Sequence, residues 1–596
     1  MKKRWLIVLL AATMLMVIGF VGCGTMQRAP AGQVRSVDVV VVGSGFAGYS
    51  AAIAAMVENP NLSMIMIEKN PFIGGISRTA AGNFNWYLWN AEHMTREQFE
   101  EGYRRWQLNA AVYTTGMNPE RTAVVPIGDP DAAAVIDTRI LPTCDLYPNF
   151  GKFHWLMQQS KRAYTFLIEQ GMSGAVGVNA GSDAVLPGQI FESRGTGRIA
   201  SMEMRLRELG VETELNKRAV RLLQNAQGEV TGVVYVHNGV ESTINARRVI
   251  LATGGFSQNL DLVKELTPAN LGGRTNSALR YVINQAGPVN STGDGIIMAR
   301  ALNPPAALYR SSFTAVTHPT MSEAFITNTL PNHYQQVFNR RDGFVYSSPM
   351  ARVQQIFVDG NGVRFRRESA GLHNRGGGHG SHFMIIHNTF PNWFIYSAAH
   401  VDNSYVYTPV SNNRVNMRAA LEAATAADAP AAIRAEVRRG NTLMELAVEM
   451  GIPADRRAAF VRMVEEYDAA VAVALAGGAW VDPLTLPANH HPMNLGNLGK
   501  PAGANNANLV RFNQGPFFAV KFYPGTFDST GGIVTCRLGR VLTQYGNDNS
   551  FIPNLYAIGG VSNRDFFQQN YVSGSSQTLY TTVGYITGKH VARSLR

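Results

Sequence analysis

Residues 37–48 read VDVVVVGSGFAG, and this stretch decides the fold class. The valine run in residues 37–42 is typical of a strand buried on both faces of a parallel sheet. Glycines stand at positions 43, 45 and 48, and residues 49–57 have the composition of a helix. A Gly-x-Gly-x-x-Gly turn between a strand and a helix predicts a dinucleotide-binding site.

Each glycine of this turn has a predicted role. Gly43 permits the tight turn, Gly45 lets backbone N–H groups approach a pyrophosphate, and Gly48 lets the helix pack close to the strand. The start of the helix supplies partial positive charge for the phosphates. Phe46 and Ala47, at the start of this helix, are predicted to contact the dinucleotide.

A second predicted strand, residues 63–67, ends at Glu68. This acid lies about 20 residues past the turn, where a carboxylate accepts hydrogen bonds from ribose hydroxyls. These residues alone leave both NAD and FAD open as the cofactor.

Four further segments carry a resemblance to a known family. Residues 68–83, EKNPFIGGISRTAAGN, are similar to the flavin-binding segment of the fumarate reductase/succinate dehydrogenase flavoprotein superfamily. The segments ATGGF (252–256), TGDG (292–295) and IPNLYAIGG (552–560) follow in the order of that superfamily. The resemblance covers about residues 37–300 and 515–596 and implies an α/β fold, with a Rossmann-like FAD-binding domain and an inserted α+β capping domain.

The resemblance implies FAD as the cofactor. No His occurs between Glu68 and Asn85, where covalent members of the superfamily carry one, so we expect non-covalent FAD. The further residues implied to contact FAD are Lys69, Gly75, Ser77, Thr79, Ala81, Gly82, Val220, Thr253, Gly254, Asp294, Gly560, Gly574 and Ser575. The last two open a helix that is expected to face the flavin ring.

The N-terminus has the pattern of an export signal. A basic start precedes an apolar stretch and then Val21-Gly22-Cys23, which resembles the lipobox of bacterial lipoproteins. We expect lipidation of Cys23 and attachment to the cell envelope; an uncleaved membrane anchor and plain secretion are the alternatives. Removal of residues 1–22 takes three positive charges from the net charge of +11.

The predicted organisation has five parts. It consists of a signal peptide (1–22), a tether (23–36), the first part of the FAD-binding domain (37–310), a capping domain (311–519) and the C-terminal part of the FAD-binding domain (520–596). Within the capping domain, apolar periodicity predicts one helix beginning near residue 442 and another over residues 456–471.

The superfamily's reductases transfer a hydride from flavin N5 to an activated C=C bond, and an acid protonates the neighbouring carbon. His318 lies in a His-Pro-Thr segment that matches the superfamily's substrate-binding His. The position of the acidic Arg is Leu372 in this chain, so Arg375 and His373 are the nearest candidates for proton donor, and another residue remains an alternative.

Two more departures concern the substrate carboxylates. Asp528 stands where fumarate reductases have a carboxylate-binding His, and Tyr571 stands where they have a carboxylate-clamping Arg. A Tyr at this place is similar to that of 3-ketosteroid dehydrogenases. True fumarate reduction is therefore not expected.

Composition limits the partners. Lysine and arginine are scattered, which argues against nucleic acid, and three cysteines are too few for a disulfide framework. Whether Cys144 and Cys536 pair is left open. The chain carries no Cys-x-x-Cys motif for haem, an iron–sulfur cluster or zinc, so no metal site is predicted and electrons must pass to or from a separate protein or a quinone-linked carrier.

The sequence thus predicts an FAD-dependent enzyme that reduces an activated C=C bond of a small molecule, or runs the reverse dehydrogenation. A ketone-directed enzyme of the 3-ketosteroid dehydrogenase kind is one alternative. A non-catalytic flavin-binding lipoprotein or electron relay is the other.

Overall fold

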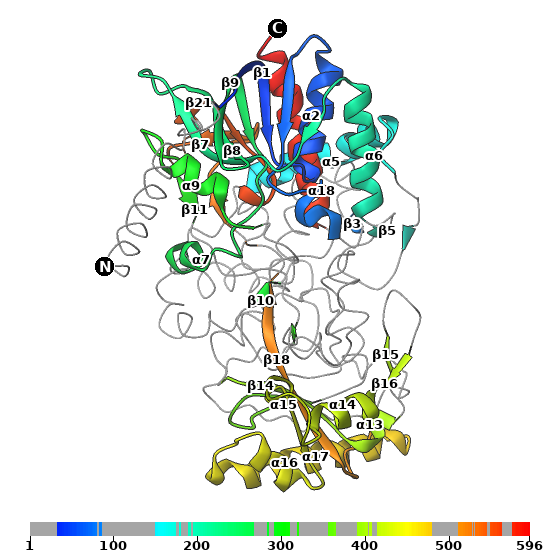
Figure 1. Ribbon diagram of the computed structural model, residues 1–596. Coiled ribbons are helices and arrows are strands. Elements are labelled where there is room, and N and C mark those ends of the chain that lie inside the picture. The colour runs from blue at the N-terminus through cyan, green and yellow to red at the C-terminus, as the bar shows by residue number, and fades with distance from the viewer. Residues whose placement is uncertain are drawn as a thin grey trace, which may run out of the picture.

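Two sheets, one of eight strands and one of six, are the largest in the described part of the chain. The computed structural model describes residues 32–79, 83–85, 150–173, 178–179, 189–191, 195–266, 283–284, 291–309, 319–320, 356–364, 390–402, 405–407, 414–478, 510–526, 529, 531–544, 547, 549–562 and 575–596. The larger sheet lies with the C-terminal helix, and the smaller one lies at the other end of the molecule (Figure 1). Within these ranges no helix is both long and apolar enough to cross a membrane.

The larger sheet has the predicted valine strand at its centre. Strand β1 (Val34–Val42) runs parallel to β2 (Met64–Ile67) on one side and to β9 (Val240–Leu251) on the other. The strand order is β20-β21-β9-β1-β2-β6, with β20 (Arg540–Leu542), β21 (Phe551–Ala557) and β6 (Thr213–Glu214) completing it. The Rossmann-like fold class predicted from the sequence is therefore confirmed.

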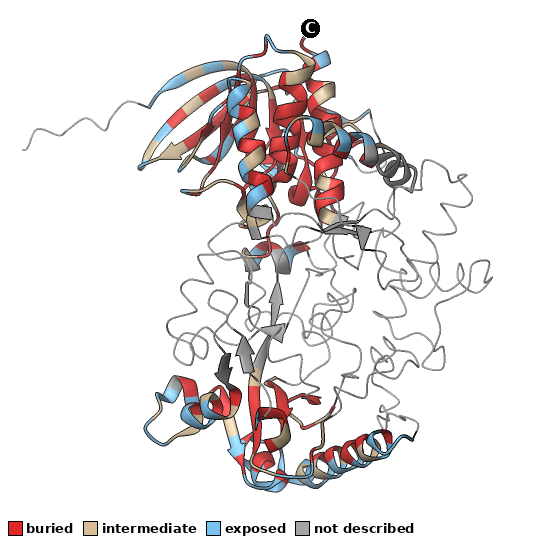
Figure 2. Cartoon of the chain, turned by 90° about the vertical axis from the view of Figure 1, so that its right-hand side faces the viewer, coloured by how far each residue is buried: buried red, intermediate tan, exposed pale blue. Residues whose placement is uncertain are grey.

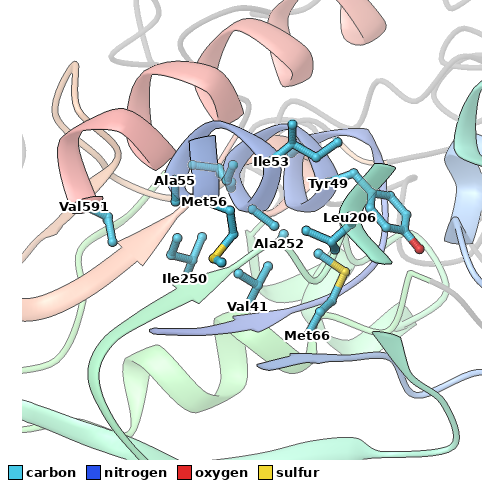
Figure 3. Packing of buried hydrophobic residues seen from close by; sticks show 14 of the residues in the cluster. Val41, Tyr49, Ile53, Ala55, Met56, Met66, Leu206, Ile250, Ala252 and Val591 are labelled. Carbon is cyan, nitrogen blue, oxygen red and sulfur yellow. The ribbon is translucent and has the colours of Figure 1, made fainter. Parts of the chain in front are cut away.

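Helices cover one face of this sheet. Val39 and Val41 are fully buried and pack against α2 (Phe46–Glu58), α6 (Gly195–Glu208) and α18 (Ser575–Arg593). Figure 3 shows Val41 and Ile250 beneath α2. Each such buried valine contributes roughly 1.5–3 kcal/mol to stability. Figure 2 shows how burial is concentrated where these helices meet the sheet.

A hairpin layer covers the opposite face. Val40 and Val42 pack there with β7 (Arg218–Gln224), β8 (Val230–His237) and α9 (Asp294–Arg300). The chain turns from β8 into β9 at Asn238 and Gly239, which have φ angles of 51° and 77°. Asn-Gly is the residue pair that a two-residue hairpin turn with positive φ angles favours.

The first and last helices of this region are in close contact. A Cβ on Gly584 of α18 would lie 2.4 Å from the carbonyl oxygen of Ala47, and one on Gly588 would lie 2.1 Å from that of Ala51. Glycines four residues apart on α18 therefore let its backbone approach α2. This contact joins the C-terminal helix to the helix that follows the glycine-rich turn.

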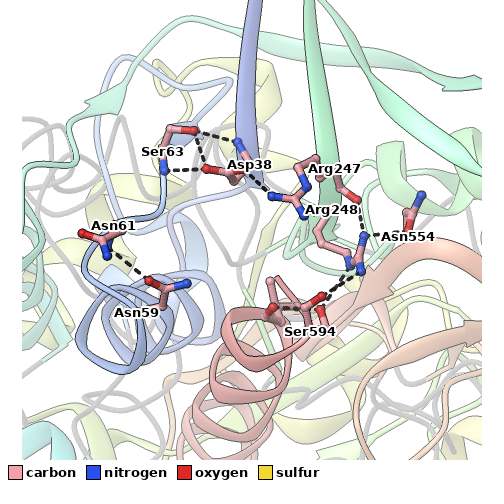
Figure 4. A network of polar contacts seen from close by, with 9 residues as sticks. Asp38, Asn59, Asn61, Ser63, Arg247, Arg248, Asn554 and Ser594 are labelled. Atoms are coloured by element: carbon pink, nitrogen blue, oxygen red, sulfur yellow. Dashed lines mark hydrogen bonds and ion pairs between the residues drawn. The ribbon is translucent and has the colours of Figure 1, made fainter. Parts of the chain in front are cut away.

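Polar contacts join the strands of the larger sheet on the side away from the glycine-rich turn (Figure 4). The carboxylate of Asp38 accepts hydrogen bonds from the backbone and hydroxyl of Ser63 and forms an ion pair with Arg247 at 3.0 Å. The backbone hydrogen bond from Ser63, with Arg247, holds the pKa of Asp38 below its ordinary value. Arg248 contacts Asn554 of β21 and Ser594 beyond α18.

The smaller sheet is built on β18 (Phe517–Thr526). Its partners are β14 (Asn392–Tyr396), β17 (Val437–Gly440), β12 (Pro319–Thr320) and β10 (Ile283–Asn284), while β13 (Ile356–Val358) pairs with β14. The two predicted helices are present as α16 (Leu443–Glu449) and α17 (Arg457–Leu475). The predicted boundary between residues 519 and 520 falls inside β18.

Candidate functional site

The glycine-rich turn leaves β1 at the carboxyl edge of the larger sheet. Gly43 has a φ of 109°, and its N–H donates to the carbonyl of Ile67 at 2.8 Å. A Cβ on Gly43 would lie 2.3 Å from the carbonyl oxygen of Ala252, and one on Gly48 would lie 2.1 Å from that of Gly43. Both positions therefore require glycine, one for the turn and one for helix packing.

The turn meets the predicted flavin loop at the start of α2. The loop contains the 3-10 helix η1 (Gly75–Thr79). The backbone N–H of Phe46 donates to the hydroxyl of Ser77 at 3.1 Å, and a Cβ on Gly45 would lie 3.3 Å from the same oxygen. The structure thus brings Gly45, Phe46 and Ser77 together, as a shared site requires.

Glu68 is buried and organises this part of the site. One of its oxygens accepts from the backbone N–H of Ser44 at 3.1 Å and from the Ser44 hydroxyl at 2.7 Å, and the other accepts from the N–H of Asn70. The Ser44 hydroxyl also accepts from the N–H of Gly74 at 2.9 Å. Because a carboxylate can accept about four hydrogen bonds, Glu68 retains capacity for the predicted ribose contact.

Lys69 and Asp294 contact each other. The Lys69 ammonium group lies 3.1 Å from the Asp294 carboxylate and donates to the Thr292 hydroxyl at 2.6 Å, and Arg218 binds Asp294 at 2.8 Å. Burial opposes ionisation of Asp294, but the Arg218 hydrogen bond and the Lys69 charge outweigh it, so the pKa of Asp294 lies below its ordinary value. This ion-pair cluster joins three elements: Lys69 follows the end of β2, Arg218 begins β7 and Asp294 begins α9.

Val220 is the extra residue of a β-bulge. Ala219 pairs with Tyr235 and Arg221 pairs with Val234, so the register between β7 and β8 shifts at Val220. The extra residue of a bulge is left out of the ladder, which frees its backbone groups for another partner. That is what the predicted contact of Val220 with FAD requires.

The remaining predicted FAD contacts that the structure describes, Thr253, Gly254 and Gly560, follow the ends of β9 and β21. Gly254 has a φ of 75°, and no atom of the described residues lies within 4 Å of an added Cβ there. The Thr253 hydroxyl packs against α9, 2.3 Å from where a Cβ on Gly295 would lie. Gly560 is buried in the 3-10 helix η9 (Gly559–Val561), and a Cβ on Gly559 would lie 2.9 Å from the Ala47 side chain. The side chain of Ala47, in the first turn of α2, therefore packs against η9.

Other predicted site residues lie outside the described residues. They are Cys23, Ala81, Gly82, His318, Arg375, Asp528, Tyr571 and Gly574. Some described segments flank them. β12 begins at the residue after His318 and pairs with β18, and the buried Ser529, next to Asp528, accepts a 2.7 Å hydrogen bond from the N–H of Phe256. Of Ser575 the backbone is described, as the first residue of α18.

Sequence reasoning missed three residues that hold this region together. Ser44 occupies a variable position of the glycine motif, Arg218 lies in an ordinary strand, and Arg198 is a fully buried cation on α6. None of them carries a motif signal. Their partners are distant in the chain, so only the folded structure identifies them.

Comparison with known proteins assigns the family. The model described as "FAD binding domain" matches residues 187–576, and that described as "FAD dependent oxidoreductase" matches residues 38–283. The chain belongs to the FAD-binding domain family. This places it in the fumarate reductase/succinate dehydrogenase flavoprotein superfamily, as an FAD-dependent oxidoreductase acting on CH–CH groups, and confirms those predictions.

Individual relatives support the same assignment. A 3-oxosteroid 1-dehydrogenase of Mycolicibacterium smegmatis is 26% identical over 93% of this FAD-binding chain and 97% of its own. A fumarate reductase (cytochrome) of Shewanella frigidimarina is 28% identical over 48% of this chain and 43% of its own. The structure of a 3-ketosteroid delta1-dehydrogenase from Sterolibacterium denitrificans, with 1,4-androstadiene-3,17-dione, has a TM-score of 0.57 at 19% identity, covering 94% and 100% of the two chains. That last likeness concerns the fold.

The residues present fit FAD. Among the described residues, none lies within 4 Å of an added Cβ on either Gly75 or Gly254, so these two backbone positions leave room for a ligand. The N-terminus of α2 offers partial positive charge to phosphates. In this FAD-binding protein the turn at Gly45, the loop at Ser77 and the bulge at Val220 would hold the cofactor.

Proposed function

We propose that this flavoprotein transfers a hydride between FAD and a carbon–carbon bond activated by a neighbouring carbonyl, of the enone or enoate type. The reaction reduces the C=C bond or, in reverse, forms it. FAD supplies the ring that gives or accepts the hydride. The protein's own side chains orient the substrate and stabilise the negative charge that gathers on the carbonyl oxygen.

The observation that carries the proposal is that Tyr571 stands at the position of the carboxylate-clamping Arg of fumarate reductases. Residues 570–576, NYVSGSS, stand where fumarate reductases have Asn-Arg-Leu-Gly-Gly-Asn-Ala, so a phenol replaces the carboxylate-clamping guanidinium. A phenol donates a hydrogen bond to a developing enolate oxygen but cannot form an ion pair with a carboxylate. This favours a ketone over a dicarboxylate, and an enone over an enoate.

Asp528 supports the same substrate class. An acid in place of the carboxylate-binding His repels a substrate carboxylate unless it is protonated or paired. The chain around it is anchored, since β18 ends at Thr526 and the hydroxyl of Ser529 accepts from Phe256. A relative matched over 97% of its own length is named for an oxosteroid, whereas the fumarate reductase is matched over 43% of its own length.

A dehydrogenation assay tests the proposal. The enzyme would be incubated with a saturated cyclic ketone, such as a 3-ketosteroid, and with succinate, using an artificial dye as electron acceptor. We expect a new conjugated enone absorbance with the ketone and no dye reduction with succinate. Dye reduction with succinate but not with the ketone would contradict the proposal of a ketone substrate. No turnover of any substrate, in dehydrogenation or in C=C reduction, would favour a non-catalytic flavoprotein.

We propose that His318 contacts the substrate and that Arg375 donates the proton, with His373 as the alternative donor. Arg375→Ala should lower the rate of enone reduction by about two orders of magnitude, the usual effect of losing an acid–base group. FAD content should stay unchanged. Full activity in Arg375→Ala would remove that residue as donor, and the same experiment on His373→Ala would then decide on the alternative.

We also propose that the chain is exported and lipidated on Cys23. The support is the basic and apolar start followed by Val21-Gly22-Cys23. The mass of the N-terminal peptide tests this: lipidation predicts a chain that begins at Cys23 and carries lipid on that cysteine. An uncleaved anchor predicts a chain that keeps residues 1–22, and plain secretion predicts a cleaved chain without lipid.

The electron partner is proposed to be a separate protein or a quinone-linked carrier, because the chain has no motif for haem or an iron–sulfur cluster. FAD is proposed to be non-covalent. Acid precipitation should then release all of the flavin into the supernatant, and flavin retained in the protein pellet would contradict this.

A further inference from the structure

Basic side chains gather on the side of the larger sheet away from the glycine-rich turn, where α18 ends. We call this the basic surface, and it consists of Arg247, Arg248, Arg540, Lys589, Arg593 and Arg596. Figure 4 shows Arg247 and Arg248 beside Ser594, which follows α18. The side chains of Arg247, Arg593 and Arg596 are 59%, 59% and 58% exposed, so their charges face solvent.

Three cations of the basic surface share one carboxylate. Arg593 lies 3.0 Å and Arg596 lies 3.1 Å from the carboxylate of Glu58, at the end of α2. The ammonium group of Lys589 lies 3.4 Å from the same carboxylate. One negative charge cannot neutralise three positive charges, so this part of the basic surface keeps an excess of positive charge.

Arg248 and Arg540 add further positive charge. Within the described part of the chain, neither of them forms an ion pair. Arg248 donates to the side-chain oxygen of Asn554 at 2.8 Å and to the hydroxyl of Ser594 at 3.3 Å, and both of these acceptors are neutral. The charges of these two arginines are therefore available to attract an anion.

The histidine beside these arginines responds to the same charge. His590 lies on α18, and its ring centroid is 5.8 Å from that of Tyr556. Burial lowers the pKa of His590 below its ordinary value, and three arginines of the basic surface lower it further. They are Arg540, Arg248 and Arg593. The charges that act on this histidine are thus positive, as expected beside a surface that attracts anions.

An exposed aromatic ring borders the basic surface. Phe551 is 38% exposed, and the Cζ atom of Arg540 lies 4.2 Å from its ring centroid. An apolar ring among cations suits a membrane interface, because the ring enters below the lipid headgroups while the cations bind the headgroup phosphates. This combination favours a lipid surface over an acidic protein as the partner.

The proposed lipid on Cys23 would hold the basic surface close to a membrane. Residues 23–34 reach at most about 40 Å when extended. Val34 begins β1, the strand whose Asp38 pairs with Arg247 of the basic surface. Because α18 begins on the side expected to face the flavin and ends at the basic surface (Figure 1), a membrane bound there leaves the flavin side accessible to substrate and electron carrier.

We propose that the basic surface binds the anionic headgroups of phospholipids and orients the enzyme with its flavin site turned away from the membrane. Each lysine or arginine near such a membrane strengthens binding by roughly fivefold. The role in the cell rests on the proposed lipidation of Cys23, whereas binding by the basic surface itself does not. The two proposals can therefore fail separately.

Vesicle sedimentation tests the surface without the lipid anchor. The chain from residue 24 onward keeps every described residue and lacks the lipidation site, so its binding reports on the surface alone. It should bind vesicles of phosphatidylcholine with 30% phosphatidylglycerol at least about tenfold more tightly than vesicles of phosphatidylcholine alone, and added salt should weaken this binding. Equal binding to both kinds of vesicle, or binding to neither, would overturn the proposal.

A double variant locates the binding. Arg593→Gln with Arg596→Gln should weaken binding to the anionic vesicles at least about tenfold, since two cations are lost. Lys589 still pairs with Glu58 in this variant, so the end of α18 stays joined to α2. The comparison of the two kinds of vesicle with the wild type decides the proposal whether or not the variant folds.

The matched control removes the same charge from the other end of the molecule. It combines Arg456→Gln in the 3-10 helix η6 (Ala454–Arg456) with Arg462→Gln in α17, and both arginines are exposed. This control should bind the anionic vesicles as tightly as the wild type. An equal loss of binding in the two double variants would mean attraction by net charge alone and would overturn the proposal.

Discussion

The hydroxyl of Ser44 donates a 2.7 Å hydrogen bond to the carboxylate of Glu68, and both groups are buried. The same hydroxyl accepts from the N–H of Gly74, so one small side chain joins the glycine-rich turn, the end of β2 and the flavin loop. The three segments that must surround FAD are thereby held in one arrangement by the protein itself.

Ser44→Ala tests this arrangement. Loss of the hydroxyl leaves the N–H of Gly74 and one oxygen of Glu68 short of a partner, which should lower the free energy of unfolding by about 1–3 kcal/mol. FAD affinity should fall as well, because the flavin loop loses its anchor. Urea denaturation and a flavin titration measure both effects. Ser63→Ala, at the opposite edge of the sheet, is the control that should lose stability alone.

The glycines of the turn should respond differently to alanine. Among the described residues, a Cβ on Gly45 would approach the Ser77 hydroxyl alone, at 3.3 Å, whereas one on Gly48 would lie 2.1 Å from a backbone oxygen. Gly45→Ala should therefore keep an apoprotein of nearly wild-type stability but bind FAD poorly, and Gly48→Ala should also lose roughly 1–3 kcal/mol of stability. Equal thermal melting of the two apoproteins would contradict the assigned roles.

Asp294→Asn probes the ion-pair cluster with Lys69 and Arg218. The variant should be less stable than the wild type at pH 7 by about 2 kcal/mol, since hydrogen bonds to charged groups are worth that much. The pKa of Asp294 is lower in the folded than in the unfolded state, so this stability is present at pH values above the ordinary pKa of 3.8 and is lost as pH falls through the lower folded value. The difference in urea midpoint between the two proteins should be constant at pH values above 3.8 and should narrow below it, and a gap that widens in acid would refute the assignment.

Tyr571→Phe tests the proposed carbonyl contact. Removing one donor to a developing oxyanion should lower the rate of enone reduction by about 10²–10³. FAD affinity and thermal stability should stay at wild-type values. An unchanged rate would reassign Tyr571 to packing.

The sequence predicted much of the fold because the decisive signals are local. The valine run and the glycine turn each lie within a short segment, and each has the predicted structure. The FAD assignment required resemblance over several segments, because the turn alone fits NAD equally well.

Long-range pairing could not be predicted. Lys69 and Asp294 were expected as FAD contacts, but the structure pairs them with each other across 225 residues of chain, and whether they also contact FAD stays a prediction. Arg198 and Gln577 are 379 residues apart. No periodicity or motif encodes such pairs, because they depend on how the helices pack.

The most direct test of the central claim is a ratio of two rate constants. The chemically reduced enzyme would be mixed without oxygen with a cyclic enone or with fumarate, and flavin reoxidation would be followed by its absorbance. A neutral-carbonyl site with Tyr571 and Asp528 predicts that the enone reacts faster by at least about a hundredfold, the scale of losing an oxyanion donor. Reoxidation by fumarate at an equal or higher rate would contradict the account.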